Sequence, residues 1–400
     1  MQKINQQIGV GCADFSEKEK HYVNQVLDSD RLSYGPFLKK FEQDFALAHE
    51  CKYGFMVNSG TSALSLSLAC LKEVHEWKNG DEVLCPSVTF VASSNSILMQ
   101  NLEPVFVDVD PRTYNIDPKK IEEKITPKTR AIMVVHLFGQ PAEMDPILEI
   151  ARKYDLKIIE DSCETMFARY RHKSVGSFGD ISCFSTYMAH YMVTGVGGLI
   201  CTNNEQYHDI VKSLANHGRD NSYLSIDDDK GLGDEGLREV VNKRFLFPRL
   251  GYSYRCTEME GALGLAQLER RDEIMLPRKF NSKYLIKYLR PFENYLQLPW
   301  SPKYVDHSFM MFPIVIQEGA PFSKTDLVMF LEKRNIETRD MNPLINQPFY
   351  TKRYGNLESQ YPVALWINNN GFYIGCHQKI SRAELDYIVN SFRAFFALSK

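Results

Sequence analysis

The 400-residue sequence lacks the marks of several protein classes. It has no uninterrupted apolar run approaching the length of about 18 residues that a transmembrane helix needs. Its first 20 residues have no apolar centre of the kind that a signal peptide carries. Its 47 basic and 50 acidic side chains leave a net charge of −3, which gives no long-range attraction to nucleic acid or anionic lipid. We therefore expect a cytoplasmic protein without a nucleic-acid or membrane partner.

Cysteine and histidine are not grouped as metal ligands usually are. The nine cysteines are scattered and none forms a CxxC pair, which argues against a disulfide framework, a zinc finger and a local iron–sulfur motif. The ten histidines include no HExxH pattern, so we predict no metal site. A GxSxG elbow, a Walker A sequence and a GxGxxG motif after a strand are also missing. Their absence weakens hydrolase, NTPase and nicotinamide interpretations.

What the sequence does contain is an alternation of apolar strand patterns with helical patterns between about residues 80 and 202. Near-continuous apolar strands separated by helices are typical of a mostly parallel sheet that is covered on both faces. The fold class predicted is therefore α/β. The predicted strands span 82–86, 104–110, 130–138, 156–161, 180–186 and 198–202, and the predicted helices span 88–101, a segment capped by Asp117, and 144–154.

The pattern predicts two domains: a large one over residues 1–270 and a smaller α+β domain over 271–400. Residues 219–243 are polar, charged and rich in glycine, and we interpret them as an exposed loop that could lie over an active site. A strong helical pattern over 258–271 leads into the small domain. That domain is predicted to contain helices at 278–289, 324–334 and 381–395, and a strand at 312–316.

Two segments place chemically useful groups at the ends of predicted elements. Gly60 and Thr61 precede the helical run 64–71, where free N–H groups and the helix dipole favour an anion, although an ordinary N-cap explains the segment as well. Asp161 follows an apolar strand, and Glu164 comes three residues later. Open α/β sheets bind ligands at such carboxyl ends, and the alternative is an aspartate that caps the next turn.

A third segment, FSTYMAHYMVTGVGG, holds Ser185 and His190 between a strand and the pair Gly197-Gly198. Histidine is the side chain best suited to proton transfer near neutral pH. A lone histidine is nevertheless often structural, and the two glycines could simply form a tight turn.

Together these segments resemble the DegT/DnrJ/EryC1/StrS family of pyridoxal-phosphate-dependent sugar aminotransferases. The resemblance runs from Tyr34-Gly35-Pro36 to the C-terminal helix. It implies the aspartate aminotransferase (type I) fold, a homodimer with sites near the subunit interface, and pyridoxal or pyridoxamine phosphate as cofactor. The motifs that carry it, in order, are NSGTSAL, PSVTF, PVFVDVD, TYNID, IIEDSCE, SFGDISCFS, TGVGG and GYSYRCTEMEGALGLAQLE.

The resemblance assigns a role to each candidate residue. It implies that Gly60 and Thr61 cradle the cofactor phosphate and that Ser185 adds a hydroxyl to the same group. It implies that Phe90 stacks on the cofactor ring. Asp161 would hold the pyridine nitrogen protonated, which turns the ring into an electron sink for carbanion chemistry.

The sequence departs from the aminotransferase pattern at the residue that holds the cofactor. Aminotransferases of this family have a lysine eight residues before the second glycine of the Gly-Gly pair, and this lysine forms a Schiff base with the cofactor. Here that position is His190, and no lysine occurs between Lys173 and Lys212. Imidazole cannot form the imine but can move a proton. Glu164 stands where aminotransferases usually have glutamine. Both departures resemble the dehydratase branch, which removes the C3 hydroxyl of nucleotide-linked 4-keto-6-deoxyhexoses.

Three further positions refine this resemblance. One group of these dehydratases carries an iron–sulfur cluster on cysteines within the segment matching 219–243, whereas this chain has no cysteine between Cys201 and Cys256. We therefore expect no iron–sulfur cluster and a likeness to the cluster-free group, whose type enzyme acts on GDP-4-keto-6-deoxymannose. Val196 replaces the glutamate of TGEGG. Ser253 replaces the asparagine of GYNYR that reaches the partner's cofactor phosphate, and its hydroxyl could still donate there.

The resulting hypothesis is a 3-dehydratase of deoxysugar biosynthesis, as in lipopolysaccharide O-antigen, with glutamate as amino donor. His190 would act as both base and acid, which requires a pKa near neutrality. His217, Arg219 and Arg255 are candidates to meet substrate phosphate or donor carboxylate, although surface arginines are usually only solvated. The rivals are an aminotransferase without its usual lysine and a non-enzymatic protein, either a cofactor-binding regulator or a decayed homologue. The sequence does not decide which nucleotide or sugar is bound.

Overall fold

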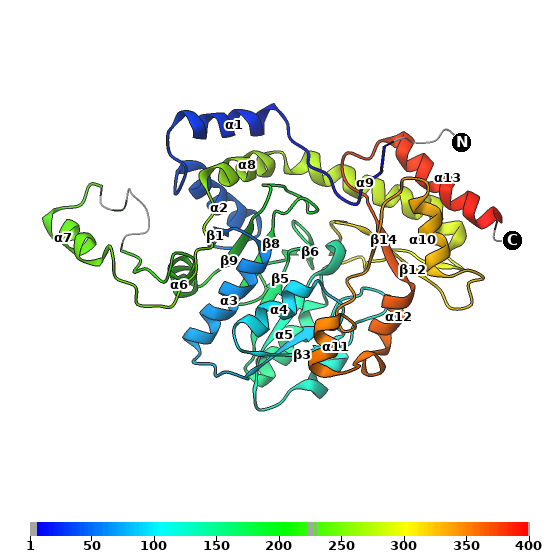
Figure 1. Ribbon diagram of the computed structural model, residues 1–400, viewed down its shortest axis with the longest axis horizontal. Coiled ribbons are helices and arrows are strands. Elements are labelled where there is room, and N and C mark those ends of the chain that lie inside the picture. Colours follow the sequence, from blue (N-terminus) through cyan, green and yellow to red (C-terminus); the bar gives the residue numbers. More distant parts are fainter. Residues whose placement is uncertain (1–5, 223–227, 229, 399–400) are drawn as a thin grey trace.

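A computed structural model describes residues 6–222, 228 and 230–398 of the chain, and its centre is a seven-stranded sheet (Figure 1). Five neighbouring strands run parallel, and the sixth, β9, lies antiparallel between β8 and β1. This confirms the α/β class and the mostly parallel sheet. The strands, in spatial order, are β1 Tyr53–Val57, β9 Gly198–Thr202, β8 Ile181–Ser185, β5 Lys157–Asp161, β4 Thr129–Val135, β2 Glu82–Pro86 and β3 Glu103–Val107.

The apolar runs of the central strands are explained by burial on both faces. In β4, Met133 and Val135 point into one core, and Ile132 and Val134 point into another. Each side chain is 4 % exposed or less, so neither face of the sheet reaches solvent here. The first face is covered by α2 (Pro36–Ala48), α3 (Gly60–Val74), α4 (Val91–Met99) and α6 (Glu205–Ala215), and the second by α5 (Met144–Tyr154).

The C-terminal part forms a second layer around a four-stranded sheet of β10 (Leu296–Gln297), β12 (Phe312–Ile316), β14 (Gly371–Ile374) and β13 (Thr338–Asp340). Its core is separate from those of the large sheet and also contains Ile8, which bridges to Ile336. Conversely, Tyr350 of α11 packs on Phe106 of the large sheet. The predicted domain boundary at residue 270 stays a prediction. Ile8, from before this boundary, packs in the C-terminal core, and Tyr350, from after it, packs on the large sheet. The helices here are α9 Arg271–Leu289, α10 Lys324–Glu332, α11 Pro348–Tyr354, α12 Pro362–Asn370 and α13 Arg382–Leu398.

Some predicted boundaries are wrong. The helix expected over 88–101 is the shorter α4, which begins after Phe90. The segment capped by Asp117 forms two 3₁₀ turns rather than an α-helix, although Asp117 does accept a hydrogen bond from the N–H of Lys119 at 3.0 Å. Pro118 allows this tight start but supplies no amide N–H. Helix α8 (Glu258–Glu269) is followed at once by α9, which begins at Arg271 rather than at 278.

The expected loop over 219–243 contains a helix. Helix α7 (Asp234–Lys243) projects from the body of the molecule in Figure 1, and only Val240 on it is buried. Its charged residues favour an exposed helix. Gly233 and Gly236 have a low helix propensity, so the sequence pattern did not predict it. Residues 223–227 and 229 of the expected loop lie outside the described part. The elements not yet given are α1 Glu17–Asp28 and a small sheet of β6 Arg169–Tyr170, β7 Lys173–Ser174 and β11 Val305–Asp306.

Candidate active site

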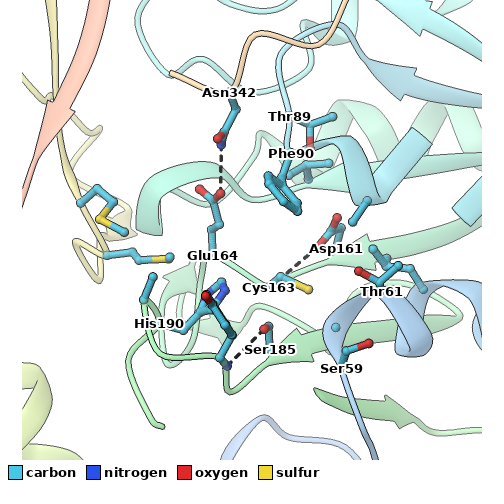
Figure 2. A pocket seen from close by; sticks show the side chains of 18 of the residues that line it. Ser59, Thr61, Thr89, Phe90, Asp161, Cys163, Glu164, Ser185, His190 and Asn342 are labelled. Carbon is cyan, nitrogen blue, oxygen red and sulfur yellow. Dashed lines mark hydrogen bonds between the residues drawn. The ribbon is translucent and has the colours of Figure 1, made fainter. Parts of the chain in front are cut away.

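A cavity of about 380 Å³ lies where β5 and β8 end and α3 and α4 begin (Figure 2). This is the edge at which open α/β sheets hold their ligands. One wall comes from these element ends, and the other comes from C-terminal residues. The sheet wall brings together seven residues predicted from the sequence: Gly60, Thr61, Phe90, Asp161, Glu164, Ser185 and His190.

The beginning of α3 supplies an anion-binding corner. The Oγ atom of Ser59 caps the helix by accepting from the N–H of Ser62 at 3.0 Å, so the N-cap interpretation is correct for that residue. The N–H groups of Gly60 and Thr61 then lack acceptors within the helix and lie beside the cavity. A Cβ atom on Gly60 would lie 2.9 Å from the Cβ of Ser185. Glycine therefore lets the helix start and the Ser185 hydroxyl share one corner.

Asp161 is held by two donors at the end of β5. Its Oδ2 accepts from Ser93 Oγ at 2.7 Å, and its Oδ1 accepts from the N–H of Cys163 at 3.2 Å. The second bond is the turn cap considered from the sequence, so Asp161 both caps the turn and lines the cavity. Within the described residues no basic side chain pairs with this carboxylate. Its charge is thus available to a cationic ligand atom.

Glu164 connects the two walls. Its Oε1 accepts from Asn342 Nδ2 at 2.9 Å and its Oε2 accepts from the N–H of Phe138 at 3.1 Å, and Figure 2 shows the first of these bonds. Both donors lie on residues with positive φ, 47° at Asn342 and 56° at Phe138. Burial raises the pKa of Glu164 to about 7, while the two donors oppose that rise. Near neutral pH this carboxyl therefore exchanges a proton readily.

His190 lies on the turn after β8, where its backbone N–H donates to the carbonyl oxygen of Tyr187 at 2.9 Å. Burial is the main cause that lowers the pKa of its imidazole to about 4; a hydrogen bond with the backbone of Cys163 opposes this shift, and the positive charge of Arg278 adds to it. This differs from the near-neutral pKa that the sequence hypothesis required. The ring is neutral at pH 7 and able to accept a proton. Within the described residues its Nδ1 has no hydrogen-bond partner.

The other predicted residues do not line this cavity. Arg255 Nη2 lies 3.2 Å from Ser253 Oγ and 3.3 Å from His217 Nε2, and these three form a separate cluster. Arg219 donates to the carbonyl oxygen of Arg244 at 2.5 Å. Ser253 and Arg255 are exposed, so the single chain leaves them open to a partner. Their roles in cofactor and substrate binding stay predictions.

Sequence reasoning missed most of the opposite wall. That wall is formed by Met310, Met311, Asn342 and Tyr373. None of them lies in a recognisable motif, because they reach the cavity through the folding of the C-terminal part. Cys163 also lines the cavity and was not predicted as a site residue, although it lies within the motif IIEDSCE.

The comparisons with known proteins agree with this geometry. The model of the DegT/DnrJ/EryC1/StrS aminotransferase family matches residues 13–393. The chain belongs to this family. GDP-perosamine synthase of Caulobacter vibrioides is 33% identical over 384 residues, which are 96% of each chain. GDP-4-keto-6-deoxy-D-mannose 3-dehydratase of Yersinia pseudotuberculosis is 30% identical over 383 residues, 94% of this chain and 96% of that one.

A solved structure of GDP-4-keto-6-deoxymannose-3-dehydratase with a trapped PLP-glutamate geminal diamine superimposes with a TM-score of 0.86. It is 28% identical and covers 96% of this chain and 99% of that chain. These likenesses confirm the predicted fold and place the chain among the pyridoxal-phosphate-dependent, sugar-modifying enzymes.

The residues of the cavity fit this cofactor. The helix start suits a phosphate, the carboxylate of Asp161 suits a protonated ring nitrogen, and Phe90, 58 % exposed, offers an aromatic face. No lysine is among the described residues that line the cavity. In the described part of the chain, no three His, Cys, Asp or Glu side chains are grouped as metal ligands, and no helix has the length and apolar character to cross a membrane.

Proposed function

We propose that the chain catalyses C3 dehydration of a nucleotide-linked 4-keto-6-deoxyhexose with pyridoxamine or pyridoxal phosphate, and that glutamate restores the amine form. The observation that carries this proposal is a cavity that contains a neutral histidine and, among its described lining residues, no lysine. A chain without that lysine has no group here to form the imine that aminotransferases use. The name of the Yersinia relative supports the same reaction and a GDP-linked substrate.

The bound amine cofactor supplies an electron-withdrawing ring and a carbon from which a proton can be removed. Asp161 would hold the ring nitrogen, and its carboxylate would favour the protonated form of that nitrogen. His190, neutral at pH 7, accepts the proton, and its conjugate acid, which is strong because burial disfavours its charge, returns a proton to the departing hydroxyl. Glu164, with a pKa of about 7, is a second group that can hold a proton beside it. The methionines of the opposite wall exclude water.

The second candidate is a nucleotide-sugar aminotransferase that works without the usual lysine. The observation in its favour is the 33% identity to GDP-perosamine synthase over 96% of the chain. We also propose a cytoplasmic homodimer, since the exposed cluster of Ser253, His217 and Arg255 would otherwise have no site to serve. No iron–sulfur cluster is part of the proposal.

Product analysis separates the two candidates. The protein is incubated with glutamate, pyridoxal phosphate and each of a small panel of 4-keto-6-deoxyhexose nucleotides, and the products are identified by mass spectrometry. A 3-deoxy sugar is the expected product. An amino sugar would overturn the proposal, and so would a lysine–cofactor bond in the wild-type protein after borohydride reduction. In His190→Lys, we expect such a bond to form and dehydration to be lost.

A further inference from the structure

Arg278, on α9, is the largest side chain that is completely buried, with an exposed fraction of 0%. A buried guanidinium is costly unless its donors are satisfied, and most buried arginines are paired with a carboxylate. Within the described residues no carboxylate forms an ion pair with Arg278. Its positive charge is instead balanced by hydrogen bonds to neutral oxygens, and this arrangement calls for a reason beyond stability.

The three donor atoms of Arg278 connect separate segments behind the cavity. Nη2 donates to the carbonyl oxygen of His190 at 3.3 Å, and Nη1 donates to that of Met310 at 3.0 Å. Nε donates to Gln378 Oε1 at 3.1 Å, and the guanidinium carbon lies 5.0 Å from the centre of the Tyr191 ring. His190 lies on the sheet wall and Met310 lies on the opposite wall, so one planar fork holds both.

We propose that Arg278 is a positioning residue for His190: its fork holds the backbone carbonyl oxygens of His190 and Met310, and so fixes the turn at 190–191 against the C-terminal part. This inference rests on the proposed role of His190 as the proton acceptor. The consequence is a rigid imidazole whose protonated form is disfavoured. Fixing a base within a fraction of an ångström is worth a large rate factor, because small displacements of a catalytic group cost up to about 100-fold.

The charge of Arg278 acts on His190 together with the groups on every element that packs around it. Burial is the main cause of the low pKa of His190, and Arg278 adds to it. A hydrogen bond with the backbone of Cys163 acts in the opposite direction, and Asp161 and Glu164 are the carboxyl groups that line the same cavity. The remaining titratable groups that line the cavity or adjoin this turn include Cys12, Cys163, Tyr187, Tyr191 and Tyr373, and Cys376 and His377 also lie within reach of the charge of Arg278.

The test compares Arg278→Met, which removes the charge and the fork, with Arg278→Lys, which keeps the charge alone. Lys283→Met is the control, since Lys283 is exposed on the same helix. The pKa of His190 is measured by NMR in the cofactor-free protein, and its signal is assigned by its loss in His190→Asn. We expect Arg278→Met to raise this pKa by about 1 unit and Arg278→Lys to leave it low.

In the loaded enzyme, both variants should lower the kcat for dehydration by about 10–100-fold with little change in KM. The control should change neither quantity. Unchanged His190 pKa and kcat in Arg278→Met would overturn the proposal, as would an equal effect of Lys283→Met. If circular dichroism shows that Arg278→Met does not fold, Arg278→Lys alone decides the test. A kcat of Arg278→Lys equal to that of wild type would refute the positioning role of the guanidinium fork. Should wild type make an amino sugar, the dehydratase assignment fails, whereas the NMR result still decides the Arg278–His190 coupling.

Discussion

The two walls of the cavity differ in chemistry and in how they are held. On the sheet wall, Asp161 and Ser185 end strands of a sheet buried on both faces, and Gly60 and Thr61 begin a helix packed on it. On the opposite wall, Met310 and Asn342 lie outside regular elements. The anion-binding corner and the Asp161 carboxylate are therefore supported by regular elements, Glu164 and His190 lie on the turns that follow β5 and β8, and the other wall contributes apolar surface and one amide. The two walls are connected by the Asn342–Glu164 hydrogen bond and by Arg278, so each wall can be changed separately to test the proposed function.

His190→Asn removes the proposed proton acceptor from the sheet wall and should have the largest effect on kcat. Asparagine keeps polarity and approximate size but cannot accept the proton, so we expect kcat for dehydration to fall by about 10²–10⁴-fold. Cofactor binding, followed by absorbance, should persist. His208→Asn is the matched control, because His208 also has a pKa lowered to about 4 by burial but lies outside the cavity. Equal losses in the two variants would remove His190 from the mechanism.

Asp161→Asn tests the charge of the same wall. Asparagine retains the hydrogen bond from Ser93 Oγ but loses the negative charge, so a protonated ring nitrogen is no longer favoured. We expect kcat to fall by about 10²-fold or more, with weaker cofactor retention. Titration of the apoprotein with pyridoxamine phosphate measures the second effect. Retention as tight as in wild type, together with full activity, would contradict this role.

Asn342→Leu tests the opposite wall and should have a smaller effect. Removing the amide takes one hydrogen bond from the ionised form of Glu164, so its pKa should rise above about 7. We expect kcat at neutral pH to fall by about 10-fold because less of Glu164 is ionised, and the acidic side of the pH profile to move to higher pH. Asn346→Leu is the control, since Asn346 follows on the same segment but does not line the cavity. An unmoved pH profile would show that Asn342 does not act through Glu164.

The same contrast explains what the sequence predicted. Strand ends and helix starts are local patterns, so the sequence pattern predicts Asp161 at a strand end and Gly60 at a helix start, and the family resemblance groups them with Ser185 in one site. His190 was noticed because it stands in a lysine's place. Asn342 and Arg278 gave no such signal, because their partners lie 178 and 88 residues away in the sequence. Helix α7 was missed because its glycines and charges are equally typical of a loop.

The last prediction concerns the free energy of unfolding, and Glu164→Gln isolates the contribution of this carboxyl group. The pKa of Glu164 is raised from 4.5 to about 7 in the folded chain, so between these values the folded state holds a proton that the unfolded state has lost. Stability contributed by this group is therefore lost as the pH rises from 4.5 through 7, by at most about 3 kcal/mol. Glutamine does not titrate. The free energy of unfolding of the variant should therefore increase relative to that of wild type as the pH rises from 4.5 to 7, and the difference between the two should be constant outside this range. Thermal unfolding midpoints at pH 5, 6, 7 and 8 measure the difference. Because Glu42 also has a raised pKa, of about 8, only the difference between the two proteins is informative, and a difference independent of pH would mean that Glu164 is ionised throughout.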